Sequence, residues 1–150
     1  MVDTEKRAPD LSDLESILGY RMKRAYMRIH RDLKPVLDEF QLTQRNFSVL
    51  SVVIGNPGIS QSEISRALAI ERSGTVVIVD ELESRDLITR ERVPGDRRAY
   101  ALHPTEAGQD FYIRARDAIQ GAERTIMSGL SDAEAQQLTA LLSTIQSEES

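Results

Sequence analysis

Two adjacent arginines, Arg97 and Arg98, follow a Pro-Gly-Asp turn in the stretch ERVPGDRRAYALHPTEAG. A guanidinium group is permanently charged and donates hydrogen bonds in a planar fork, so it suits phosphates and the concentrated negative potential of a narrow minor groove. The turn is flanked by LITRERV and RRAYALH, whose β-branched and aromatic residues predict the two strands of a hairpin. The sequence therefore indicates a hairpin with a positively charged tip.

Three helices are predicted directly before this hairpin. The first covers about residues 43–55, with Thr43 as its N-cap, and the second opens at the capping box SQSE. The third covers about residues 73–85; its run TVVIV also suits a buried strand, but the continuation DELESRD favours a helix. Three helices followed by a hairpin form a winged helix-turn-helix, in which the third helix enters the major groove of DNA and the hairpin reaches a minor groove.

Candidate residues for DNA contact lie on the second and third helices and on the hairpin. They are Gln61, Ser62, Arg66, Arg72, Ser73, Thr75, Val76, Val77, Arg90, Arg97 and Arg98, with Asp96 as a support for the wing. Valine can touch a thymine methyl group but cannot form paired hydrogen bonds, so Arg72, Ser73 and Thr75 carry most polar contacts in this prediction. The competing interpretations are solvated surface charges for the arginines and a brace between Asp96 and one wing arginine.

The charge distribution makes attraction to DNA local rather than global. The 150 residues have a formal net charge of −5, which by itself opposes binding to phosphates. However, residues 21–34 hold six Lys and Arg against one acidic residue, and residues 85–98 hold five Arg against three acidic residues. The last twenty residues hold four acidic residues and no basic one. Positive charge is therefore concentrated in two segments of an acidic chain.

Long helical segments flank the predicted DNA-binding lobe of residues 43–104. In residues 11–40, apolar residues recur every three or four positions, which predicts one long helix with a kink or break near Pro35. Residues 109–147 continue a helix capped at Thr105 and add another that opens at the capping box SDAE. Both segments carry a larger apolar stripe than a small domain needs to cover its own core.

The stretches LTQRNFSVLSVVIGNPGISQSEISRAL and RSGTVVIVDELESRDLITRERVPGDRRAYALHPTEAG resemble the multiple-antibiotic-resistance regulator (MarR) family over about residues 11–145. The wing is the most specific element, because residues 96–98 (Asp-Arg-Arg) precede LHPTEAG; Asp86 stands where the family frequently has Gly. The resemblance implies a mainly α fold with a small β-hairpin wing, in which a winged helix-turn-helix is flanked by N- and C-terminal dimerisation helices. It further implies one MarR-type domain over residues 1–150, acting as a homodimeric repressor on a palindromic site in double-stranded DNA.

The resemblance also implies a small aromatic or anionic effector, bound between the dimerisation helices and the winged lobe. The candidate ligand-binding residues are a basic ridge and a set of aromatic and polar side chains: Arg21, Arg24, Arg28 and Arg31, and Tyr26, His30, Phe47 and Ser51. The ridge would suit an effector with phosphates, such as an aromatic acyl-coenzyme A. The competing interpretations are a solvated helix face for the ridge and ordinary core packing for the other four.

Several other classes of function are disfavoured. The chain has no cysteine, and His30 and His103 lie far apart without ligand spacing, so neither thiolate chemistry nor a metal site is expected. It has no nucleophile elbow and no glycine-rich phosphate loop, so we expect neither an enzyme nor a cofactor. The polar stretch MVDTEKRAPD and the lack of long apolar runs favour a cytoplasmic protein that does not associate with membranes. The alternative function is a winged-helix module that binds other proteins.

Overall fold

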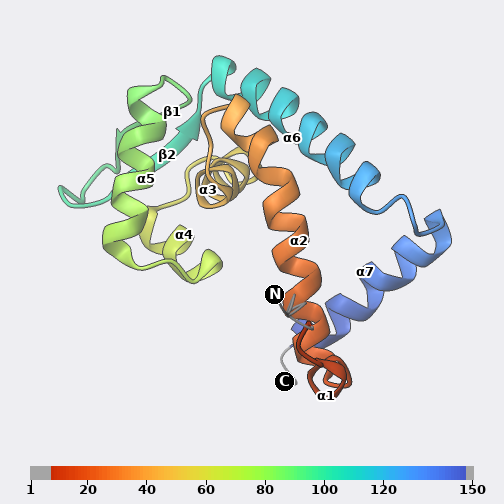
Figure 1. Cartoon of the computed structure of the whole chain (residues 1–150). Helices are drawn as coiled ribbons and strands as arrows, with labels where there is room; N and C mark the ends of the chain where they lie inside the picture. Colours follow the sequence, from red (N-terminus) through yellow and green to blue (C-terminus); the bar gives the residue numbers. More distant parts are fainter. Residues whose placement is uncertain (1–7, 148–150) are drawn as a thin grey trace, which may run out of the picture.

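A computed structural model describes residues 8–147 of the chain. Short elements form a compact lobe: α3 (Gln44–Gly55), α4 (Gln61–Leu68), α5 (Arg72–Ser84), β1 (Ile88–Arg92) and β2 (Tyr100–Pro104). The remaining helices are α1 (Ser12–Glu15), α2 (Leu18–Glu39), α6 (Glu106–Ile126) and α7 (Asp132–Gln146). Figure 1 shows α2 and α6 leaving the lobe as two long arms, with α1 and α7 at their far ends. The mainly α-helical fold with a β-hairpin wing agrees with the sequence prediction.

The core of the lobe comes from apolar residues at helical spacing in α3, α4 and α5 and at alternating positions of the hairpin. It is formed by Val49, Leu50, Val53, Ile64, Ile78, Val79, Leu82, Leu87, Ile88 and Leu102. The strands pair antiparallel, with Ile88 opposite Pro104 and Arg92 opposite Tyr100. An isolated bridge joins Ile59 to Leu102, so the chain between α3 and α4 also ties to the hairpin. The run TVVIV lies inside α5, which confirms the helix over the strand alternative.

All four predicted N-caps are present. The Thr43 hydroxyl accepts a hydrogen bond from the Asn46 amide at 3.1 Å. In the box at α4, Ser60 accepts from the Glu63 amide at 3.2 Å, and the Glu63 carboxylate accepts from the Ser60 amide at 2.9 Å. The box at Ser131 and the cap at Thr105 have the same local geometry. These caps satisfy backbone amides that have no partner within a helix, so they set where α3, α4, α6 and α7 begin.

The sequence predicts a kink or a break of the N-terminal helix near Pro35, and the predicted break is wrong. The helix is interrupted at Ser16 and Ile17, where Ile17 is extended, and α2 then runs through Pro35 to Glu39. Pro35 is exposed, so its ring faces solvent while Leu37, on another face of the helix, packs into the core. Packing of the apolar face against α6 outweighs the one backbone hydrogen bond that proline removes.

A tight joint connects the lobe to α6. The Thr105 hydroxyl accepts from the Gly108 amide at 2.9 Å and donates to the Asp86 carbonyl oxygen. A Cβ atom on Gly108 would lie 1.9 Å from the carbonyl oxygen of Leu87, so only glycine fits there. Asp86 has φ +55°, which explains why a glycine suits that position. The residues of the LHPTEAG stretch therefore join the hairpin to α6.

Large apolar side chains remain exposed on the arms. They lie in α1, the start of α2, and α7: Leu14, Ile17, Leu18, Met22, Leu138, Leu141, Leu142 and Ile145. Figure 1 shows these segments at the same end of the molecule, away from the lobe. The chain exposes 11497 Å², whereas a compact monomer of 16.8 kDa exposes about 7,600 Å². The arms thus carry an apolar surface that the single chain does not cover.

Candidate DNA interface and ligand cavity

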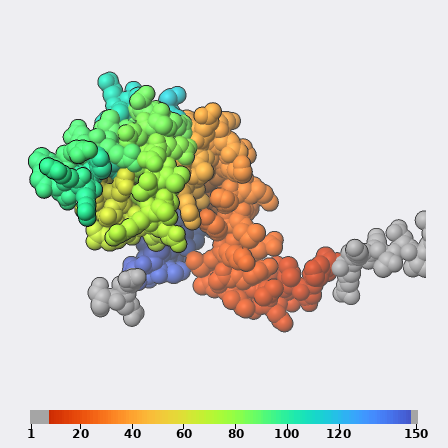
Figure 2. Space-filling model, turned by 90° about the vertical axis from the view of Figure 1, so that its left-hand side faces the viewer, coloured from red at the N-terminus to blue at the C-terminus, as the bar shows by residue number. Residues whose placement is uncertain are grey.

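The outer face of α5 carries a mixed polar and apolar surface. Val76 is 40% and Val77 is 64% exposed, and Arg72 and Ser73 beside them are also exposed. Figure 2 shows α5 and the hairpin on one side of the lobe, with the hairpin tip projecting at its edge. Exposed valine methyl groups on a helix that buries its other face are available to contact thymine methyl groups.

Thr75 does not belong to this face, and its predicted DNA contact is wrong. Its side chain is fully buried, and its hydroxyl lies 2.8 Å from the Ser65 hydroxyl and donates to the Glu71 carbonyl oxygen at 3.2 Å. These bonds join α4 to the first turn of α5. Thr75 therefore holds the two helices of the helix-turn-helix together, because a buried hydroxyl needs such partners.

A shallow hollow lies between α4 and the start of α5. Ser62, Arg66 and Arg72 line it, together with Glu71. Ser62, Arg66 and Arg72 are exposed, so their donors are accessible to a phosphate. The fold thus brings Arg72, a predicted contact of the third helix, beside two predicted contacts of the second, Ser62 and Arg66.

The hairpin tip is shaped by hydrogen bonds of its own backbone. The Asp96 amide donates to the Val93 carbonyl oxygen at 3.2 Å, and Gly95 between them has φ +88°. The Asp96 carboxylate accepts from the backbone amide of Arg98 at 2.9 Å. Within residues 8–147, neither wing arginine forms a salt bridge, so the brace is between Asp96 and the backbone of Arg98. Both wing arginines are exposed.

The sequence predicts that Arg90 and Gln61 contact DNA, but in the fold their side chains contact each other, and Arg90 also contacts α5. The guanidinium group of Arg90 pairs with Asp80 and, at 2.8 Å, with Glu83, and its side chain is only 20% exposed. With the Gln61 amide turned so that its oxygen faces donors, that oxygen accepts from Arg90 at 3.1 and 3.2 Å. The donors of Arg90 are thus occupied within the lobe, which corrects its assignment as a free phosphate contact.

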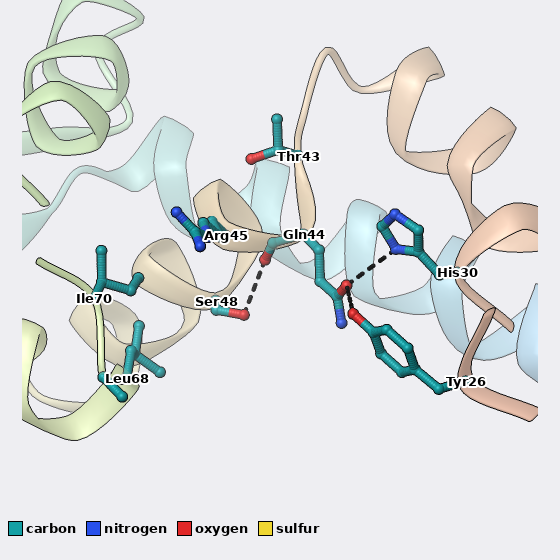
Figure 3. Close-up of a pocket in the computed structure, with 9 residues that line it drawn as sticks. Tyr26, His30, Thr43, Gln44, Arg45, Ser48, Leu68 and Ile70 are labelled. Carbon is teal, nitrogen blue, oxygen red and sulfur yellow. Dashed lines mark hydrogen bonds between the residues drawn. The ribbon is translucent and has the colours of Figure 1, made fainter. Parts of the chain in front are cut away.

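A cavity of about 460 Å³ lies between α2, the start of α3 and the turn from α4 to α5. Figure 3 shows Tyr26 and His30 pointing toward Gln44. The Tyr26 hydroxyl and His30 Nδ1 both lie 3.2 Å from Gln44 Oε1, so Nδ1 carries the proton in this bond. Arg45 and Ser48 add polar groups, and Leu68 to Ile70 form the opposite wall. We call this the outer cavity.

An inner cavity of about 210 Å³ adjoins the outer one and is mostly apolar. It shares four lining residues with the outer cavity and adds Ile29, Leu33, Leu37, Phe47, Ile119 and Glu123. Phe47 stacks on Tyr112 of α6, with ring centroids 5.4 Å apart. Sequence analysis named Tyr26, His30 and Phe47 in this region but missed Gln44, Arg45 and the wall 68–70. Gln44 and Arg45 follow the cap of α3 directly, but only the fold brings α2 against them.

The remaining ligand candidates do not line either cavity. Ser51 instead lies 3.0 Å from the Tyr112 hydroxyl. The ridge of Arg21, Arg24, Arg28 and Arg31 lies on the opposite side of α2, because positions two residues apart on a helix differ by about 200°. Arg28 and Arg31 pair with Asp32, at 3.7 and 2.7 Å. Within one chain, the ridge therefore does not line the cavities that the aromatic set lines.

A model of the MarR family matches residues 40–99, which include α3, α4, α5, β1 and the turn that follows β1. A putative transcriptional regulatory protein for the hcr operon of Thauera aromatica is 33% identical over 126 residues, which are 83% of this chain and 76% of that protein. The chain belongs to the MarR family of transcriptional regulators.

Solved structures of the transcriptional repressor CouR are similar to this chain along nearly its whole length. CouR bound to a 23-mer DNA duplex has a TM-score of 0.87 and 34% identity, covering 93% of this chain and 99% of CouR. CouR bound to p-coumaroyl-CoA has a TM-score of 0.81 and 32% identity, covering 95% of this chain and 100% of CouR.

Among residues 8–147, no helix has the length and apolar character of a membrane-spanning segment.

Proposed function

We propose that the protein is a homodimeric repressor that binds a palindromic operator, with α5 in the major groove and the hairpin tip in the neighbouring minor groove. The main support is the joint exposure of Val76, Val77 and Arg72 on α5 and of the unpaired Arg97 and Arg98 at the tip. Two such surfaces on one lobe match the geometry by which winged helix-turn-helix proteins contact DNA.

The uncovered apolar surface of α1, α2 and α7 supports the dimer. A second copy would bury the exposed Leu18, Leu141 and Ile145, and pairing through a twofold axis would place two copies of α5 on one face of DNA. Dimerisation would use residues 11–40 and 109–147, while residues 43–104 form the DNA-binding lobe. Residues 1–7 and 148–150 of the single domain expected over 1–150 lie outside the described residues.

We expect the two adjoining cavities to bind the effector. An apolar inner cavity lined by Phe47 and a polar outer cavity with Arg45 suit a molecule that has an aromatic part and an anionic part, such as an aromatic acid or its coenzyme A thioester. CouR, solved with p-coumaroyl-CoA, is similar to this chain. The outer cavity is walled by residues 68–70, directly before α5, so a ligand there changes the position that α5 prefers.

The DNA interface is tested by changing both wing arginines, Arg97→Ala with Arg98→Ala. We expect loss of measurable operator binding at physiological salt. The slope of log affinity against log salt concentration should fall by about 4, because the dimer loses two cations from each subunit. The matched control is Arg28→Ala with Arg31→Ala, which removes the same charge from α2. Fluorescence anisotropy over a range of salt, with sedimentation to verify the dimer, measures both. Equal affinities for the two double variants would refute the wing assignment and favour a protein-binding module.

The effector is tested by titrating the protein–DNA complex with hydroxycinnamoyl-coenzyme A, free aromatic acids and unrelated anions. We expect only compounds that are both aromatic and anionic to release the DNA. The inner cavity selects the aromatic ring, and Arg45 of the outer cavity selects the negative charge. Arg45→Gln should weaken release about tenfold through loss of one charge-assisted contact, whereas Arg24→Gln on the ridge should not. The opposite order would assign the anionic group to the ridge, and indifference to every compound would remove the effector proposal.

A further inference from the structure

Arg90 occupies the junction of three elements of the winged lobe. It lies in the middle of β1, and its guanidinium group contacts Asp80 and Glu83 in the second half of α5. Gln61, the first residue of α4, faces the same group with its amide oxygen. One planar cation therefore ties the outer part of the hairpin to both helices of the helix-turn-helix.

We propose that Arg90 is a positioning residue that holds the wing at a set angle to the recognition helix α5, and that it does not contact DNA phosphates. This proposal rests on the proposed function, since it concerns how the two DNA-contacting surfaces are arranged. A two-stranded hairpin is only marginally stable on its own. Its base is anchored by the buried Ile88 and Leu102, but the positions beyond Arg90 on β1 are exposed.

The geometry of the contacts suits a positioning role. A guanidinium group offers donors in fixed directions, so two carboxylates and an amide that engage it at once restrict its orientation. The side chain is 20% exposed, so these contacts are partly shielded from water and salt. Burial lowers the pKa of Arg90, but the contacts with Asp80 and Glu83 outweigh it and hold the pKa above its ordinary value. Arg90 is therefore charged at every physiological pH.

The same contacts remove a repulsive charge from the DNA-facing helix. Asp80 is 57% exposed on α5, one turn beyond the exposed Val76 and Val77. A free carboxylate at that place would repel the phosphates beside the groove. Pairing with Arg90 neutralises it, so loss of Arg90 would both release the wing and expose negative charge.

The first test separates positioning from phosphate contact by using a duplex that the unaltered dimer selects from random-sequence DNA. Arg90→Ala should lower the affinity about tenfold through loss of the wing position, whereas Arg98→Ala, which removes one cation from each subunit, should lower the slope of log affinity against log salt concentration by about 2. In a background that carries Asp80→Ala and Glu83→Ala, Arg90→Ala should change the affinity less than about twofold, because its partners are gone. An equal loss of affinity in both backgrounds would overturn the proposal, because a phosphate contact by Arg90 does not depend on Asp80 or Glu83.

The second test needs no DNA and therefore also separates this inference from the proposed function. Because the chain has no cysteine, Glu81→Cys and Val93→Cys provide unique sites for spin labels on α5 and the wing. Double electron–electron resonance measures the distance between the two labels of one chain when labelled chains are diluted with unlabelled ones. The distribution should broaden with Arg90→Ala and with Arg90→Lys, which keeps the charge but lacks the fork.

The matched control is Arg92→Ala, two residues along the same strand, where the guanidinium group lies over the Tyr100 ring. It should leave the distance distribution narrow. If Arg90→Ala leaves the distribution as narrow as Arg92→Ala does, Arg90 does not position the wing. Urea unfolding of each variant verifies that the lobe is folded, and Arg90→Lys provides the result if Arg90→Ala does not fold. If the unaltered protein selects no duplex from random-sequence DNA, the proposed function is refuted. A distance distribution that broadens with Arg90→Ala would still support the positioning role of Arg90.

Discussion

Glycine and threonine side chains decide how the winged lobe connects to the long helix α6. Gly108 lies against the backbone of Leu87, and Thr105 caps α6 while its hydroxyl also reaches Asp86. Each of these contacts involves backbone atoms, which cannot move away as the end of a flexible side chain could. The conformation of this joint sets the direction in which α6 leaves the hairpin, so these few residues influence both the wing and the dimerisation arm.

At the residue scale, Gly108→Ala should lower the free energy of unfolding by about 3 kcal/mol, because the new methyl group would overlap the Leu87 carbonyl. Gly121→Ala in the same helix is the control. A Cβ there would meet nothing closer than Arg124 at 3.8 Å, so this change should raise stability by about 0.5–1 kcal/mol through helix propensity. Urea unfolding at one fixed protein concentration measures both. A neutral Gly108→Ala would contradict the tight joint.

At the scale of elements, α4 depends on its capping box and on the pairing of Ser65 with Thr75 to hold its place beside α5. The Ser60 backbone amide and hydroxyl donate to the Glu63 carboxylate and lower its pKa below the ordinary 4.5. A lowered folded-state pKa adds stability that is fully present above about pH 4.5 and is lost as the pH falls through the folded value.

We therefore expect the stability of the unaltered protein to fall more steeply between about pH 5 and 3 than that of Glu63→Gln, which has no proton to bind. Glu81→Gln, which removes an exposed carboxylate outside any cap, should keep the steeper dependence. Urea unfolding across this pH range compares the three proteins. If Glu63→Gln follows the same curve as Glu81→Gln, the cap does not contribute to the acid sensitivity of the lobe.

At the scale of the whole molecule, the single chain is an open shape. The lobe has its own buried core, and a smaller cluster of Leu37, Leu42 and Ala115 joins it to α2 and α6. Beyond that cluster, α7 has no buried residue. A helix whose large apolar residues are all exposed gains little stability from its own chain, so a second chain is expected to cover them.

Leu141→Glu with Ile145→Glu should therefore convert the dimer into monomers and weaken operator binding at least about a hundredfold, because a palindrome is bound by two linked lobes. The lobe itself should stay folded. Gln136→Glu adds a negative charge to the opposite side of α7 and should leave the dimer intact. Analytical ultracentrifugation and anisotropy measure assembly and binding. A dimer that survives the double change would place the interface elsewhere.

Much of the fold follows from local signals in the sequence. Thr43, Ser60, Thr105 and Ser131 mark helix starts because a side-chain oxygen three residues before a free backbone amide can bond to it in almost any context. Helical periodicity and the Pro-Gly turn likewise indicate the helices, the hairpin and the charged tip without knowledge of their neighbours. These features depend on residues close together in the chain, so the sequence alone determined them.

Only the tertiary structure decided which side chains have partners within the chain and which are available to contact other molecules. Arg90 and Arg97 are both arginines of the hairpin, but the fold places two carboxylates of α5 beside Arg90, whereas Arg97 forms no salt bridge within residues 8–147. It also buries Thr75, carries α2 through Pro35 and brings Gln44 against Tyr26. Such outcomes depend on contacts between distant segments, whose combined packing energy exceeds the local preference of any one residue.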